Sequence, residues 1–243
     1  MSGAGAYIAS VLYLLPGLLI GTVLHELAHA AIAARFGNPA PRRRLSLDPR
    51  RHLDPLGTAT LLIAGFGWNR PVTIDPLFLR RTGPRAAAAL AGPLAHLIVA
   101  AVFAVALRVE VLTSGIDVGG LLVLSQHSLQ GIVTGVLMQG FLVNLALLVF
   151  NLVPLPGLDG YVLARCLWFH SSPRLFLWLE AQRGLVYVLA VVVVVALPEL
   201  TGGAVNPLAA ATVGLAGAAY AHMVEPGVTP LFLALPNVFT LFA

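Results

Sequence analysis

The chain has 243 residues, of which 58% are hydrophobic and only 10% are charged. Soluble domains carry about 25% charged residues, so this composition excludes an ordinary soluble domain and indicates a polytopic membrane protein. The formal net charge is +4 and every basic residue is an arginine, but these arginines follow membrane topology and form no basic face, which excludes nucleic-acid binding. The single cysteine, Cys166, excludes an internal disulfide, and the absence of a charged region before the first apolar run argues against a cleaved signal peptide.

The first apolar segment, residues 6–35, predicts a membrane-spanning helix that carries unusual polar side chains. Its length of about 30 residues exceeds the roughly 20 needed to cross a bilayer. Ahead of Arg35, its only charged side chain is Glu26 and its only histidines are His25 and His29. Ionisable side chains are costly inside a membrane, so this group is expected to be functional.

The next segment, residues 35–85, holds ten of the fourteen arginines. The positive-inside rule therefore places it in the cytoplasm and the N-terminus outside. Within it, Leu56–Trp68 is apolar, rich in glycine and threonine, and too short to span as a helix. Non-helical backbone at membrane depth is tolerated only where it is buried or lines a wet cavity. We predict a short re-entrant β-hairpin here; the alternative is a loop lying on the membrane surface.

Two further spanning helices are predicted at residues 86–107 and 131–150, and with the first helix they form a three-helix core. The first of them opens with Ala91-Gly92-Pro93-Leu94-Ala95-His96, whose small residues favour close helix contact. Residues 108–128, between the two helices, are expected to form an outer loop. After the third span, the stretch NLVPLPGLDG at residues 151–160 interrupts the helix with two prolines and two glycines.

The C-terminal part is predicted to form another helix pair, at residues 185–197 and 206–222, followed by an apolar tail. The predicted fold is thus an all-α polytopic membrane protein with five to six transmembrane helices and one re-entrant β-hairpin. We divide it into a membrane-embedded core, residues 1–170, and a C-terminal helix pair with its tail, residues 171–243.

The polar side chains of the first helix form the pattern HELAH, an HExxH motif. Two histidines four residues apart lie about 40° apart around a helix and one turn apart along it, so both imidazoles can bind one metal ion. Glu26 projects about 100° from His25, and in HExxH hydrolases this glutamate is the general base. If Arg35 marks the cytoplasmic end, His25 and His29 lie roughly 9 to 15 Å deep.

A catalytic zinc site needs a third protein ligand and an open position for water. Asp159 is the leading candidate, because it is the only other acidic residue that apolar sequence flanks at a break on the cytoplasmic side. A helix N-cap is an alternative role for Asp159. His96 is the rival ligand, although such a residue is more often a hydrogen-bonded contact between helices.

Together, HELAHA at residues 25–30 and NLVPLPGLDG at residues 151–160 resemble the signatures of the site-2 protease family of intramembrane zinc metalloproteases. The resemblance covers roughly residues 15–165 and is to the compact branch without a PDZ domain. It implies one zinc ion bound by His25, His29 and Asp159, with Glu26 as general base and Asn151 holding the substrate or the oxyanion. Relatives often have asparagine at the position of His96, which leaves the role of this residue open.

The resemblance implies a protease that cleaves the transmembrane or membrane-near part of another protein. We expect a multi-pass protein of a prokaryotic plasma membrane, with the active site opening toward the cytoplasm and the hairpin offering an edge strand to the substrate. The expected partners are a transmembrane protein substrate and the lipid bilayer, and a homodimer is left open. The alternatives are a metal-binding membrane transporter and a catalytically silent scaffold. The nearly featureless spans after Asp159 argue against the first, and the presence of all four groups argues against the second.

Overall fold

The computed structural model describes residues 3–38, 45–64, 70, 81–117, 120, 128–202 and 207–225. Within these residues the chain is mostly helical and forms no β-sheet. The elements are α1 (Gly3–Arg35), η2 (Pro49–Arg51), α2 (Pro55–Ala64), α3 (Thr82–Ser114), α5 (Leu129–Leu152), α6 (Asp159–Trp168), α7 (Pro173–Ala181), α8 (Arg183–Val191), the π-helical turn η3 (Val192–Ala196), α9 (Leu197–Leu200) and α10 (Pro207–Met223).

Three of these helices are long and apolar enough to cross a membrane: Val11–Arg35 of α1, α3 and α5. The predicted helical fold is therefore confirmed, and the chain is a membrane protein. The three predicted spans of the core coincide with these three candidate helices. The two predicted C-terminal spans are also helical, as α8 to α9 and α10, but they are not among the three candidates in the described part of the chain. The count of five to six spans stays a prediction.

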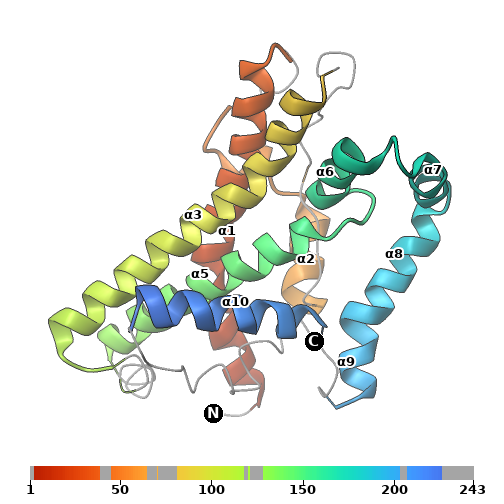
Figure 1. Cartoon of the computed structure of the whole chain (residues 1–243). Helices are drawn as coiled ribbons and strands as arrows, with labels where there is room; N and C mark the ends of the chain where they lie inside the picture. Colours follow the sequence, from red (N-terminus) through yellow and green to blue (C-terminus); the bar gives the residue numbers. More distant parts are fainter. Residues whose placement is uncertain are drawn as a thin grey trace.

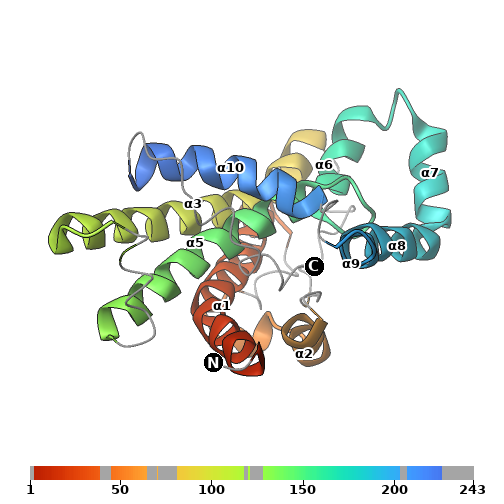
Figure 2. The same cartoon turned by 90° about the horizontal axis from the view of Figure 1, so that it is seen from below.

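The three long helices pack on one another pairwise, and α10 lies across α3 and α5 (Figures 1 and 2). Both views place α7, α8 and α9 to one side of this bundle. The helix α6 packs against α3 and the end of α5, so its first residue reaches the bundle. The largest apolar cluster joins α3, α5 and α10, with Leu107, Phe141, Leu145 and Tyr220 almost fully buried.

The crossing of α1 and α5 depends on two glycines. An added Cβ on Gly17 would overlap the Cα of Gly140, so the two backbones are in direct contact. Small residues permit this close approach, which van der Waals packing stabilises where no hydrophobic effect acts between membrane helices. The crossing fixes the depth of α1 against α5.

We expect Gly17→Ala to destabilise the bundle by about 1–3 kcal/mol, because the added methyl group forces two backbones apart. Gly214→Ala on α10 is the matched control, since its Cβ would meet nothing within 4 Å. Both changes carry the same intrinsic gain in helix propensity. Thermal unfolding in detergent should give a lower midpoint for Gly17→Ala alone; equal midpoints would contradict the close crossing.

The β-hairpin predicted at Leu56–Trp68 is wrong for its described part, which forms helix α2. Pro55 takes the first helical position, where no N–H is needed, and the Asp54 carboxylate accepts hydrogen bonds from the N–H groups of Leu56 and Gly57 at 3.1 and 2.9 Å. These start signals outweigh the glycine and threonine content. Residues 65–68 and the tail after residue 225 lie outside the described residues.

Candidate metal centre

The candidate centre lies where α1, α3 and the start of α6 meet. Helix α1 supplies His25, Glu26 and His29, and α6 begins at Asp159. His25, His29 and Asp159 each offer one ligand atom, and these atoms lie within 4.8 Å of one another. The two histidines are buried, with 5% and 4% of their surfaces exposed. The structure thus brings together the three residues proposed as ligands from the sequence, although their roles stay predictions.

The spacing of the three donors suits one small metal ion. The Nε2 atoms of His25 and His29 are 3.0 Å apart. From the Asp159 carboxylate, Oδ2 lies 3.3 Å from His25 Nε2 and Oδ1 lies 3.1 Å from His29 Nε2. Tetrahedral zinc with bonds of about 2.1 Å separates its ligands by about 3.4 Å, so only small adjustments are needed.

Hydrogen-bond chemistry also favours a cation between these atoms. His29 Nδ1 lies 2.6 Å from the carbonyl oxygen of Ala88, and a carbonyl only accepts, so Nδ1 carries the hydrogen. In the neutral ring Nε2 then carries a lone pair and no hydrogen, and this lone pair faces His25 and the carboxylate of Asp159. Asp159 Oδ2 is buried and accepts no hydrogen bond within the described structure. The lone pair of His29 Nε2 therefore faces the Asp159 carboxylate, an arrangement that is costly, and a metal ion would satisfy both groups together.

Helix α3 forms the wall of the centre at Gly92. An added Cβ there would overlap His29 Nε2 and lie 2.5 Å from His25 Cε1. The backbone of α3 therefore touches both imidazoles, and only glycine leaves room for them. Sequence reasoning noted the small residues of this helix but missed this contact; the signal was glycine beside proline inside an apolar helix.

A tight return of the chain places Asp159. Helix α5 ends at Leu152, and an added Cβ on Gly160 would overlap the carbonyl group of Leu152, so the start of α6 folds back onto the end of α5. The N-cap of α6 is Leu158, and it makes no side-chain capping bond. Asp159 is instead the first helical residue, with its carboxylate on the two histidines. This geometry does not support the N-cap alternative.

The two residues predicted to act in catalysis differ in position. Glu26 is buried, 4% exposed, and follows His25 directly on α1. It lies outside the three-donor group, as a general base should. The amide of Asn151 donates to the carbonyl oxygen of Leu147 at 2.9 Å, one turn back in α5. Its role at the oxyanion stays a prediction.

His96 is not part of the three-donor group. Its Nδ1 lies 2.9 Å from Oδ1 of Asn144, and its ring packs on His25 with the centroids 4.7 Å apart. The structure therefore favours the predicted interhelical polar contact over the rival ligand. Sequence reasoning missed Asn144, although an asparagine within an apolar helix was a signal.

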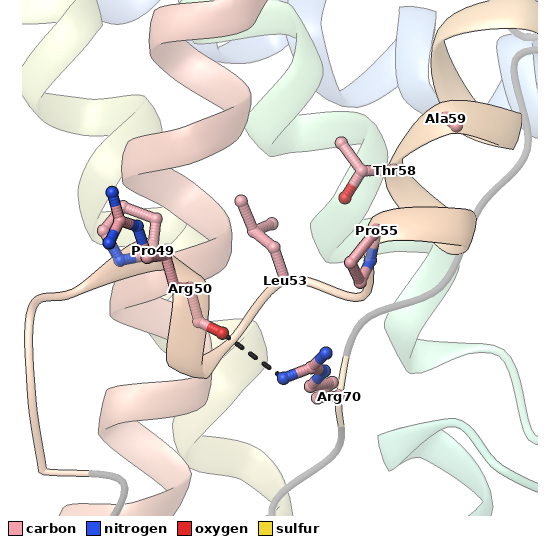
Figure 3. A pocket seen from close by; sticks show the side chains of 7 residues that line it. All are labelled: Pro49, Arg50, Leu53, Pro55, Thr58, Ala59 and Arg70. Carbon is pink, nitrogen blue, oxygen red and sulfur yellow. Dashed lines mark hydrogen bonds between the residues drawn. The ribbon is translucent and has the colours of Figure 1, made fainter.

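A separate open pocket of about 610 Å³ lies beside η2 and the start of α2 (Figure 3). Arg70 donates to the carbonyl oxygen of Arg50 at 3.5 Å within this pocket. No histidine, cysteine or acidic side chain is among the seven lining residues, so this pocket provides neither metal ligands nor a general base. The lining residues are Pro49, Arg50, Leu53, Pro55, Thr58, Ala59 and Arg70.

Comparison with known proteins gives relatives of one kind. The chain is 40% identical over 163 residues to "Putative zinc metalloprotease YwhC" of Bacillus subtilis, covering 61% of this chain and 66% of that protein. It is 36% identical over 163 residues to "Putative zinc metalloprotease Rip2" of Mycobacterium tuberculosis, covering 64% of this chain and 57% of that protein. The matched region thus spans just under two thirds of the first relative and over half of the second. No family model matches the chain, and no solved structure matches it significantly.

Proposed function

Because the chain belongs to the site-2 protease family, we propose that it is an intramembrane zinc endopeptidase. Its substrates are other membrane proteins, cleaved in or near their transmembrane segments. The observation that supports this function most strongly is the group of His25, His29 and Asp159, which joins α1 to α6 and whose two histidines are buried. It combines the ligand types of a catalytic zinc site with a position inside a bundle of apolar helices.

The donors fit zinc in number and kind. His25 and His29 would bind through Nε2 and Asp159 through its carboxylate, and three protein ligands leave one position open for water. When bound, zinc supplies Lewis-acid activation of that water and of the scissile carbonyl group. The carbonyl of Ala88 holds the ring of His29 through Nδ1–H, which keeps Nε2 directed at the centre.

The remaining chemistry belongs to side chains of this chain. Glu26 takes a proton from the attacking water and returns it to the leaving amine, the usual role of the glutamate in HExxH. Asn151 is our candidate donor for the developing oxyanion; its amide would have to leave the carbonyl of Leu147 to reach the substrate. Since α2 is helical over residues 55–64, a substrate strand cannot add to an edge within those residues.

We assign the centre to the cytoplasmic half of the membrane. His29 lies six residues before the last residue of α1, Arg35, which is a rise of about 9 Å. The arginine-rich segment that follows supports a cytoplasmic location of this end in a multi-pass protein of a prokaryotic plasma membrane. The division into a core at residues 1–170 and a C-terminal part at residues 171–243 is part of this proposal. The homodimer left open by the sequence stays a prediction.

Removing the third ligand tests the metal assignment. We expect purified wild-type protein to contain about one zinc ion per chain, and Asp159→Ala to contain far less and to cleave no substrate, because two imidazoles alone hold zinc poorly. Asp48→Ala is the control, since Asp48 is exposed and caps η2 through the N–H of Arg50. Metal analysis beside cleavage of a single-span substrate in detergent measures both effects.

An unchanged zinc content in Asp159→Ala would contradict the assignment of this ligand. The transporter alternative makes a different prediction, namely metal flux into liposomes that contain the protein, without cleavage of any substrate. The silent-scaffold alternative predicts zinc binding with neither flux nor cleavage. These two assays therefore separate the three functions.

A further inference from the structure

A second buried polar group lies next to the metal centre and takes no part in the chemistry proposed above. It consists of His96 on α3 and Asn144 on α5, which are 2% and 0% exposed. His96 Nδ1 and Asn144 Oδ1 are 2.9 Å apart. A buried polar pair is costly among apolar helices unless its hydrogen bonds are complete, so its bonds indicate what it does.

The hydrogen bonds of Asn144 fix the orientation of both side chains. Its Nδ2 group donates to the carbonyl oxygens of Gly17 at 3.1 Å and Gly140 at 2.8 Å. Carbonyl oxygens only accept, so Nδ2 must face them and Oδ1 must face His96. His96 Nδ1 therefore carries a hydrogen and donates it. The amide of Asn144 is satisfied at both ends, and it joins α1, α3 and α5 at one point.

This junction lies on the same row of α1 as the proposed ligands. Gly17, Gly21, His25 and His29 follow one another at four-residue intervals, which places them along one face of the helix. An added Cβ on Gly21 would overlap Asn144 Oδ1, so the pair presses against α1 one turn before His25. The ring of His96 then packs on the ring of His25, with centroids 4.7 Å apart and planes at 40°.

The two proposed imidazole ligands are held in different ways. Ligand histidines usually donate their second N–H to a carboxylate, a carbonyl or water, which fixes the ring. His29 follows this rule through Ala88. The ring of His25 instead faces the backbone of Gly92, a looser hydrogen-bond contact than that of His29. Contact with the anchored ring of His96 therefore adds a second constraint on the ring of His25.

We propose that His96 and Asn144 are positioning residues that hold the His25 imidazole and the register of α1 for metal binding. This inference rests on the proposed zinc site and deepens it. His96 acts through His25 rather than on the metal, because it lies outside the group formed by His25, His29 and Asp159. Removing either partner frees the ring of His96, and His25 loses its orientation.

Co²⁺ binding to the full-length protein in detergent tests the proposal, since cobalt absorption reports both affinity and ligand geometry. The variants are His96→Phe, Asn144→Leu and the double variant. We expect each to bind Co²⁺ about tenfold more weakly or worse, with an altered visible spectrum. The control is Thr134→Val, which removes the hydrogen bond of the buried Thr134 hydroxyl to the carbonyl oxygen of Gln130 elsewhere on α5. This variant should bind Co²⁺ as the wild type does.

Thermal unfolding separates positioning from a merely structural role. His96→Phe leaves Asn144 Oδ1 unpaired and Asn144→Leu leaves His96 Nδ1 unpaired, so each lowers the midpoint. The double variant leaves neither side-chain atom unpaired and should recover part of the loss, since the carbonyls of Gly17 and Gly140 still lack the Asn144 donor. Positioning predicts that the double variant regains stability but not Co²⁺ affinity. Affinity that returns together with stability, or that never falls, would overturn the inference. If a single variant does not fold, the double variant still decides. Wild-type protein that binds no Co²⁺ would instead overturn the proposed zinc function itself.

Discussion

Replacing Glu26 with glutamine is expected to abolish peptide hydrolysis while zinc remains bound. Glutamine keeps the size of the side chain but cannot take a proton from water, and a positioned general base typically contributes about 10²–10⁴-fold to the rate. The proposed ligands are His25, His29 and Asp159, so the metal should stay. Cleavage of a single-span substrate and the zinc content of the same preparation measure both parts of the expectation.

The control for this change is Glu110→Gln, which removes a carboxylate near the far end of α3. It should cleave substrate at the wild-type rate. If Glu26→Gln cleaved as fast as Glu110→Gln, another group would have to be the base and the proposed chemistry would fail. If Glu26→Gln lost its zinc as well, Glu26 would be needed to hold the metal, and loss of cleavage would say nothing about proton transfer.

Gly92→Ala is expected to weaken zinc binding strongly, although it adds only one methyl group. The new Cβ would overlap His29 Nε2 and lie 2.5 Å from His25 Cε1. The carbonyl of Ala88, which lies on α3 like Gly92, accepts the hydrogen bond of His29. The imidazole therefore cannot move away from Gly92 without losing that bond. A displacement of about 1 Å at such a site can cost about 10²-fold. We therefore expect zinc affinity and cleavage to fall by at least about 10²-fold.

Gly83→Ala is the matched control, because Gly83 lies on the same helix and its Cβ would meet nothing within 4 Å. Isothermal titration with zinc, together with thermal unfolding of the metal-free protein, distinguishes a local clash from general loss of structure. A Gly92→Ala variant that binds zinc as tightly as Gly83→Ala would show that the wall formed by α3 is less close than described.

The meeting of His25 and His29 was predictable because it follows from helix periodicity, a local rule that needs only sequence spacing. The position of Asp159 was harder to predict, since Asp159 comes from a distant segment. The prolines and glycines around it still marked a helix break on the predicted cytoplasmic side. The contacts of Gly92 and Asn144 could not be predicted. They depend on how closely three helices approach one another, and spacing along one helix carries no such information.

The same contrast applies to the fold. Long apolar runs predicted α1, α3 and α5, because length and hydropathy alone decide whether a helix can cross a membrane. The sequence predicts a hairpin at Leu56–Trp68, because this apolar segment is too short to span as a helix and is rich in glycine and threonine. The described part of the segment is helical instead, and the Asp54 carboxylate caps its first turn. A single capping side chain can decide a short segment, whereas it has little influence on a long one.

The return of the chain from α5 to α6 has a consequence for resistance to unfolding. An ion bound by both His29 and Asp159 would cross-link two points of the chain, and the loop between them contains all of α3 and α5. A ligand that binds only the folded state at 100 times its Kd adds about 2.7 kcal/mol. Chelation should therefore lower the temperature at which the helices around the site unfold, so the proposed metal would stabilise the fold as well as supply chemistry.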